Sequence, residues 1–208
     1  MSDYASKRCV TLICGSSGTG KTSFALRYVA NCQAKTRFFF DPDQEFAERL
    51  RTPGAGTACE LDLATLRGCS VFDPLPIFGE STLDAVNFWA EYAWEWSEKI
   101  PGRKIVVLDE LQRYSKPQAQ PSKLSLLMEA GRRRGIELLL MTNRPSQING
   151  VVWNQVTEIV CFQTQCEGAV DGLTRYGFDP AELPRLAPLH WIARNTMTGG
   201  ELRGKLTF

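Results

Sequence analysis

The segment 15–22, with the sequence GSSGTGKT, constrains the fold of this chain more than any other feature. It matches the phosphate-binding pattern GxxxxGK[ST]. The apolar run before it (9–15, CVTLICG) predicts a buried strand, and the stretch after it (21–33, KTSFALRYVANCQ) predicts a helix. Glycines in such a loop let backbone amides turn inward around phosphate oxygens, and the helix N-terminus adds partial positive charge. A chance glycine-rich turn is disfavoured because both flanking elements are in place.

The loop and the first helical turn supply candidate ligands for the phosphates of a nucleotide. These residues are Gly15, Ser16, Ser17, Gly18, Thr19, Gly20, Lys21, Thr22 and Ser23. Lys21 is expected to reach the β- and γ-phosphates, and the Thr22 hydroxyl to bind Mg²⁺.

A second part of the same site is predicted at 105–110, IVVLDE. Asp109 at the end of a buried strand can hold the Mg²⁺ shell, and Glu110 can orient and polarise an attacking water. This pairing favours hydrolysis over transfer of the phosphoryl group to a metabolite, which needs no water-activating glutamate.

Composition indicates one globular domain and excludes several other classes of protein. The chain has 208 residues, 43% of them hydrophobic and 23% charged, with a net charge of +1. Anion binding must therefore come from local clusters. The seven scattered cysteines lack a CxxC pair, and the single His190 is not near any of them in the sequence, which favours reduced thiols over zinc. No signal peptide and no apolar run of ~18–20 residues is present, which predicts a soluble intracellular protein.

Apolar runs alternate with helical patterns along the chain, which predicts a mainly parallel α/β sheet. Further strands are expected at 36–41, 104–110, 135–143 and 156–164, with weaker ones near 57–61 and 69–73; further helices are expected at 43–51, 81–100, 122–133 and 168–177. The runs 189–194 and 201–208, joined by Thr198, Gly199 and Gly200, predict a terminal hairpin. A capping box formed by Ser81 and Asp84 opens the helix 81–100. Its three tryptophans are expected to pack on the sheet or a partner subunit rather than to form a cofactor cage.

The segment 131–145, GRRRGIELLLMTNRP, places polar groups at both ends of one apolar strand. Asn143 follows the carboxyl end, where parallel strands converge on a nucleotide, so it is a candidate to bind the γ-phosphate or the attacking water. A simple turn asparagine is the alternative. Arg132, Arg133 and Arg134 lie at the other end, more than about 20 Å away at ~3.3 Å per residue. They could serve a neighbouring subunit's nucleotide in trans or complement a helix dipole.

Taken together, the chain resembles the FtsK–HerA branch of P-loop ATPases. The matching segments are FFFDPDQEF, VVLDE, GRRRGIELLLMTNRPSQI and GLTRYGFDPAELPRLAPLHWIAR. They span the chain from about residue 9 to its end and leave 52–100 poorly accounted for. The resemblance implies a RecA-like (ASCE) fold with 1–208 as a single ATPase domain. Within it, 42–100 would be an irregular insertion plus the Trp-rich helix, and 186–208 the C-terminal hairpin.

The resemblance also implies a function, since members of this branch are ring motors that move DNA. The chain is most similar to the genome-packaging ATPases of tailless icosahedral viruses with internal membranes. ATP and Mg²⁺ are the implied cofactors. The implied partners are double-stranded DNA, copies of the same chain in a pentameric or hexameric ring, and capsid-vertex or membrane proteins of the virion, in the host cytoplasm or the virion. By position Arg132 matches the residue that acts in trans, and Asn143 stands where the family usually has glutamine.

Loops after two strands are the candidate DNA contacts. Their cations are Arg113, Lys116, Lys123 and Arg144, which could touch phosphates without reading sequence; ordinary solvated loops are the alternative. Three other functions stay open: a filamentous-phage-type assembly ATPase, a small-molecule P-loop kinase with an acceptor pocket in 42–80, and a slow nucleotide-dependent switch.

Overall fold

The structure, a computed structural model, describes residues 10–32, 34, 36–50, 69–80, 82–165 and 167–207. The strands are β1 (Val10–Cys14), β2 (Thr36–Phe40), β3 (Cys69–Phe72), β4 (Lys104–Leu108), β5 (Ile136–Thr142), β6 (Glu158–Cys161), β7 (His190–Asn195) and β8 (Glu201–Lys205). The helices are α1 (Lys21–Asn31), α2 (Glu45–Leu50), α3 (Leu75–Phe78), α4 (Leu83–Lys99), α5 (Ser122–Ala130), α6 (Gly150–Gln155) and α7 (Glu167–Thr174).

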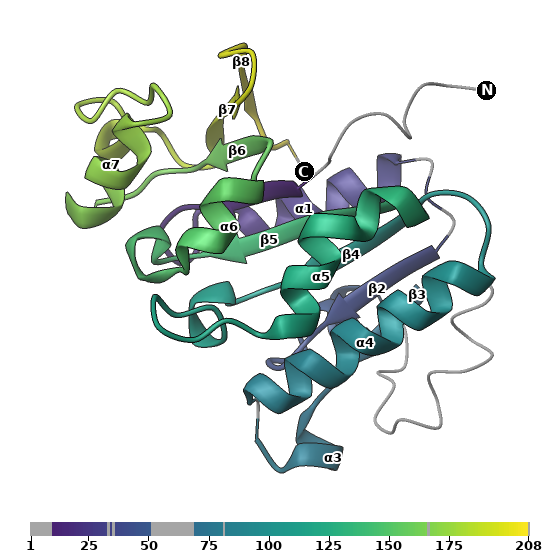
Figure 1. The fold of residues 1–208 in the computed structure, drawn as a ribbon. Coiled ribbons are helices and arrows are strands. Elements are labelled where there is room, and N and C mark those ends of the chain that lie inside the picture. Colours follow the sequence, from purple (N-terminus) through teal and green to yellow (C-terminus); the bar gives the residue numbers. More distant parts are fainter. Residues whose placement is uncertain are drawn as a thin grey trace.

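The strands form one sheet with the order β3-β2-β4-β5-β1-β6-β7-β8 (Figure 1). The first six strands in this order, from β3 through β1 to β6, pair in parallel, and β7 and β8 add an antiparallel hairpin at one edge. The expected mainly parallel α/β fold with a C-terminal hairpin is therefore confirmed. Strand β5 lies between β1 and β4, with Cys14 opposite Thr142 and Leu108 opposite Leu140. The carboxyl ends of these three strands consequently meet at one edge of the sheet.

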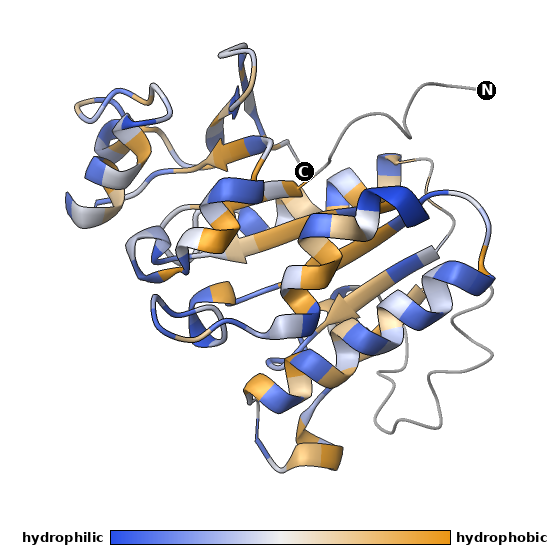
Figure 2. Ribbon diagram, viewed as in Figure 1, coloured by the Kyte–Doolittle hydropathy of each residue, from blue (hydrophilic) through white to orange (hydrophobic). Residues whose placement is uncertain are grey.

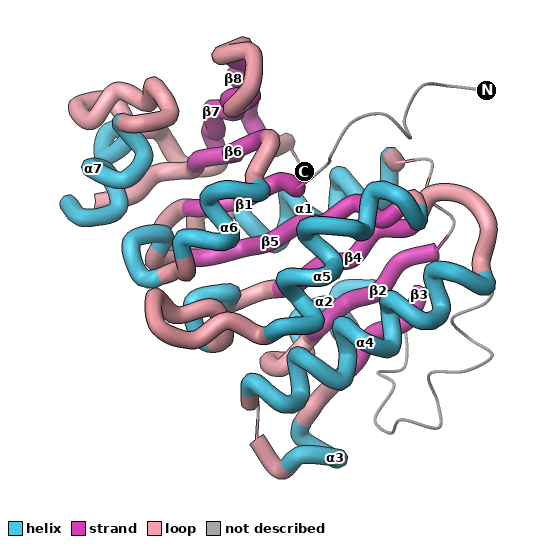
Figure 3. The backbone as a smooth tube through the Cα atoms, viewed as in Figure 1, coloured by secondary structure: helices cyan, strands magenta, loops and turns pink. Residues whose placement is uncertain are grey.

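Side chains alternate between the two faces of the sheet, as strand geometry requires. Leu12, Val106 and Leu138 join a core under α4 and α5, whereas Ile13, Val107 and Leu139 join a core under α1. Figure 3 shows α4, α5 and α6 crossing the front of the sheet and α1 behind it. Because both faces are covered, the central strands are almost uniformly apolar (Figure 2).

Helix α4 uses its first tryptophan to pack on the sheet. Trp89 is fully buried, with its ring centroid 5.4 Å from that of Phe40. The helix is capped by Thr82, whose hydroxyl accepts a hydrogen bond from the Ala85 amide at 3.3 Å. The predicted capping box of Ser81 and Asp84 is therefore wrong, because Thr82 takes the cap position and Ala85, which has no acidic side chain, lies three positions on.

Local structure differs from expectation in the second half of the chain. The helix predicted at 122–133 ends at Ala130 and continues as the 3₁₀ turn Gly131–Arg134. The weak strand near 57–61 lies outside the described residues. Helix α6 was not predicted, because six residues are too few to show a helical period; its N-cap, Asn149, accepts a hydrogen bond from the Val151 amide at 2.9 Å. None of the helices in the described residues is long and apolar enough to cross a membrane.

Glu158, at the start of β6, gives a prediction about stability. Burial raises the pKa of this carboxyl, the nearby Glu137 acts in the same direction, and a hydrogen bond from Thr11 opposes them. A folded-state pKa above the unfolded value means that stability falls as pH rises through the interval between the two. Glu158→Gln is therefore expected to raise the free energy of unfolding at pH 7, by about 1 kcal/mol or less because solvent screens a half-buried group. Urea unfolding at pH 7 and pH 3 checks this: the gain should vanish at pH 3, and a loss at pH 7 would contradict it.

Candidate active site

The loop between β1 and α1 needs glycine at two positions for steric reasons. Gly15 has φ 150°, and a Cβ there would lie 2.7 Å from the Cβ of Phe162. Gly20 has φ 115°, and a Cβ there would lie 3.0 Å from Leu206 Cδ1. The Ser16 amide donates to the carbonyl of Gln163 at 2.8 Å, which ties the loop to the end of β6. The loop is thus held between β6 and the C-terminal hairpin.

The N-terminus of α1 points into this loop with its positive end uncompensated. Its N-cap is Gly20, which offers no side chain to the first-turn amides, and the first turn has no acidic residue. Unpaired amides and the helix dipole together favour an anion at such a terminus. The geometry therefore suits a phosphate group.

Lys21 is folded inward over the loop. Its Nζ donates to the carbonyl oxygens of Gly15 and Ser16, both at 3.0 Å. Burial lowers the pKa of Lys21, while the carboxylates of Asp109 and Glu110 act in the opposite direction. The ammonium is thus available to phosphate oxygens, which are better acceptors for a cation than neutral carbonyls.

Asp109 and Glu110 follow the carboxyl end of β4, beside β5. Asp109 Oδ1 accepts a hydrogen bond from the Glu110 amide at 2.6 Å. Burial raises the pKa of Asp109 to about 6; the charge of Glu110 adds to this and that of Lys21 opposes it. Glu110 has φ 52°, a left-handed conformation that costs a non-glycine residue about 1 kcal/mol. This strain lies at the residue expected to activate water.

Three donors surround the Glu110 carboxylate. Asn143 Nδ2 donates to Oε1 at 3.4 Å. Gln112 Nε2 donates to Oε2, and Arg113 Nε lies 3.6 Å from the same oxygen. Asn143 Oδ1 is buried and has no hydrogen-bond partner among the described residues. The structure therefore brings together the acidic strand end and the polar strand end that the sequence places 33 positions apart.

Three residues of this site were not predicted from the sequence, namely Gln112, Thr142 and Asp43. Gln112 is only 9% exposed and accepts a hydrogen bond from the Thr142 hydroxyl at 2.7 Å. Asp43 forms a two-pronged ion pair with Arg113, each N–O distance being 3.0 Å. The signal for Gln112 was a polar side chain two positions after Glu110. No local pattern could have paired Asp43 with Arg113, 70 positions away.

The three consecutive arginines lie at the amino end of β5, opposite Asn143, as expected. Arg134 is held within the chain: its guanidinium stacks 3.6 Å from the ring centroid of Trp94 and pairs with Glu98 at 3.1 Å. Arg132 and Arg133 are exposed on the 3₁₀ turn. Arg134 is therefore held within its own subunit.

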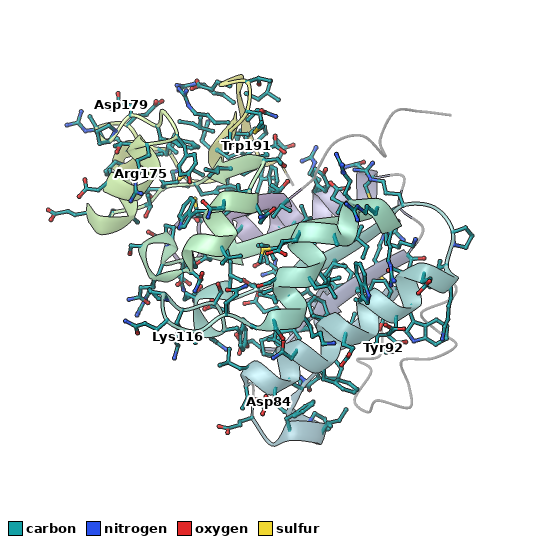
Figure 4. All side chains as sticks on the ribbon, in the orientation of Figure 1. Asp84, Tyr92, Lys116, Arg175, Asp179 and Trp191 are labelled. Carbon is teal, nitrogen blue, oxygen red and sulfur yellow. The ribbon has the colours of Figure 1, made fainter. Side chains whose placement is uncertain are left out.

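The candidate DNA contacts divide into two groups. Arg113 is paired with Asp43, and Lys123 lies in α5 with its ammonium 2.6 Å from Glu91. Both are exposed ion pairs, which contribute little, so a DNA contact of either cation stays a prediction. Lys116 and Arg144 are exposed, and neither forms an ion pair with another described residue. Figure 4 shows Lys116 on the loop that leads to α5.

The two loops that carry Lys116 and Arg144 lie side by side. Asn149 Nδ2 donates to the carbonyls of Lys116 and Pro117 at 2.9 and 3.0 Å, and its amide donates to the carbonyl of Ser115 at 3.1 Å. The loops after β4 and β5 therefore form one surface next to Glu110 and Asn143.

A glycine-rich loop before a helix, an acidic strand end and a strand inserted between β1 and β4 define a RecA-like P-loop fold. Comparison with solved structures supports this assignment of the fold. The chain is similar to the genome packaging NTPase B204 from Sulfolobus turreted icosahedral virus 2 in complex with AMPPCP, with a TM-score of 0.74 and 16% identity over 95% of this chain and 97% of that one. It is also similar to B204, the DNA-packaging ATPase from Sulfolobus turreted icosahedral virus, with a TM-score of 0.69 and 16% identity over 97% of this chain and 98% of that one.

A third similar structure is VirB4 of Thermoanaerobacter pseudethanolicus, with a TM-score of 0.69 and 13% identity over 100% of this chain and 93% of that one. No protein-family model matches the chain, and no curated protein sequence matches it. At these identities the similarity establishes the fold, and the expected likeness to FtsK–HerA-type P-loop ATPases is confirmed at that level.

Proposed function

We propose that the chain is an ATP-hydrolysing ring motor that translocates double-stranded DNA, most simply to package a viral genome into a preformed capsid. The observation that carries this proposal is the convergence of Lys21, Asp109, Glu110 and Asn143 at one edge of the sheet. The likeness in fold to a genome-packaging NTPase over 95% of the chain supports it.

In the proposed reaction the loop amides and Lys21 hold the phosphates of ATP. Lys21 exchanges its two carbonyl acceptors in the loop for β- and γ-phosphate oxygens. Thr22 and Asp109 would hold Mg²⁺, and their oxygen donors suit this ion. Burial raises the pKa of Asp109, and a nearby dication would favour the ionised carboxylate that binds it. The bound ion would supply neutralisation of charge on the phosphate oxygens.

Glu110 and Asn143 would act on the attacking water. The free acceptor Oδ1 of Asn143 orients the water, and Glu110 takes its proton as the oxygen bonds to the γ-phosphorus and ADP leaves. Arg132 of an adjacent subunit would stabilise the charge that develops on the transferred group. A ring would therefore be needed for full activity.

The paired loops of Lys116 and Arg144 would face DNA in the pore of the ring. Contacts of lysine and arginine with phosphates bind without reading base sequence, which suits a motor. The virion vertex, with its capsid or membrane proteins, would be the site of action.

The test is ATP hydrolysis with and without double-stranded DNA, measured as phosphate release, together with sedimentation of the protein bound to nucleotide. DNA is expected to stimulate turnover of the oligomer. The Lys116→Ala/Arg144→Ala variant is expected to weaken DNA binding and to reduce the slope of log affinity against log salt by about 1.8 per subunit, at ~0.9 per lost contact. Lys99→Ala/Arg175→Ala removes the same charge elsewhere and serves as the control. A monomer whose turnover ignores DNA would instead support a kinase or a switch.

A further inference from the structure

A chain of hydrogen bonds links the loop that carries Arg144 to Glu110. The Arg144 amide donates to the Thr142 hydroxyl oxygen at 3.1 Å, and that hydroxyl donates to Gln112 Oε1 at 2.7 Å. Gln112 Nε2 in turn donates to Glu110 Oε2. All three donors point the same way, toward the carboxylate. Since aligned hydrogen bonds polarise one another, a change at the first is felt at the last.

The middle of this chain is shielded from solvent. Thr142 is fully buried and Gln112 nearly so. Water does not readily replace either partner there, and a lost bond leaves a buried polar group unpaired, which is costly. The three bonds therefore hold a defined arrangement rather than one among many.

The same arrangement distinguishes the two oxygens of Glu110. Gln112 and Arg113 both face Oε2, whereas Oε1 faces Asn143, whose own Oδ1 lacks a partner among the described residues. The contacts on Oε2 thus turn Oε1 toward the strand end where water would be held.

We propose that Gln112 is a positioning residue that orients Glu110 and couples it, through Thr142, to the conformation of the Arg144 loop. This inference rests on the proposed function, in which Glu110 activates water and the Arg144 loop touches DNA. Contact of that loop with a phosphate shifts the Arg144 amide, the Thr142 hydroxyl follows, and Gln112 passes the change to Glu110. The device would make hydrolysis depend on whether DNA occupies the pore.

The kinetic test compares matched variants of the full chain. Gln112→Met and Thr142→Val remove hydrogen bonds with little change in volume, and each is expected to lower kcat about 10- to 100-fold with KM for ATP unchanged. The double variant should be no slower than the slower single variant, since both break one chain. Thr142→Ser keeps the hydroxyl and should retain most activity. Thr11→Val, a buried threonine of β1 that faces Glu158, is the control. Multiplicative effects of the two changes, or an effect on KM alone, would overturn the proposal.

A second readout needs no turnover. Thr142→Val is expected to speed hydrogen–deuterium exchange in the turn 110–113 as well as at Arg144, while Thr142→Ser should not. Faster exchange confined to Arg144 would overturn the coupling even in an active enzyme. If the wild-type protein hydrolysed no ATP, the proposed function would fail, and the exchange experiment would still decide whether the link exists.

Discussion

Replacing Lys21 by alanine is expected to weaken ATP binding by at least about 30-fold, because removing one member of a buried charge pair costs 2–5 kcal/mol and each 1.4 kcal/mol is tenfold. The Lys21 ammonium already lies between the loop carbonyls of Gly15 and Ser16. A phosphate entering the loop takes the place of these acceptors, so the lysine is the main positive charge it meets. The dissociation constant of a fluorescent ATP analogue measures the effect.

The fold of the Lys21→Ala variant should survive the change. Burial lowers the pKa of Lys21, which means that the charged side chain is held at a cost when no anion is bound. Circular dichroism and thermal unfolding check this. Lys99→Ala, at the far end of α4 and exposed, is the control. An affinity equal to that of the control would contradict phosphate binding by the loop.

The existence and type of the main elements could be predicted from the sequence because local patterns decide them. Buried runs such as that of β4 are too short for a helix and too apolar for a surface strand. The order of the strands in the sheet could not be predicted in this way. No pattern in the segment 136–142 says that β5 inserts between β1 and β4, since every neighbouring strand in the core offers the same kind of apolar face.

The active site likewise contains residues that the sequence predicts and residues that it does not. The phosphate loop and the Asp109–Glu110 pair are contiguous motifs whose chemistry is evident from residue type and spacing. The bonds of Gln112 with Glu110 and Thr142 depend on the register of β4 against β5 and on the left-handed turn at Glu110, neither of which is encoded locally. The pairing of Arg113 with Asp43 shows the same limit, because a cation in a polar loop looks solvated until the fold supplies its carboxylate.

Mixing two inactive variants is expected to restore ATP hydrolysis if Arg132 acts in trans. Glu110→Gln removes the proton acceptor, and Arg132→Ala removes the charge offered to the neighbouring subunit; each alone should lower kcat at least about 100-fold. In rings assembled at random from equal amounts, about a quarter of the interfaces join an intact Glu110 to an intact Arg132, because contacts around a ring are head-to-tail. Phosphate release should then recover to about a quarter of the wild-type rate if interfaces act independently.

The structure supplies the matched controls for this experiment. Arg133 is exposed on the same 3₁₀ turn, so Arg133→Ala should keep activity if Arg132 is the residue in question. If Arg133→Ala is inactive and complements Glu110→Gln while Arg132→Ala does not, the role belongs to Arg133. Arg134→Ala should instead lower stability, because its guanidinium holds Trp94 and Glu98 in the same subunit. Native mass spectrometry must show that the rings mix. Mixed rings without recovered hydrolysis would mean that neither arginine completes a neighbour's site, since an interface with all its catalytic groups intact would still be inactive.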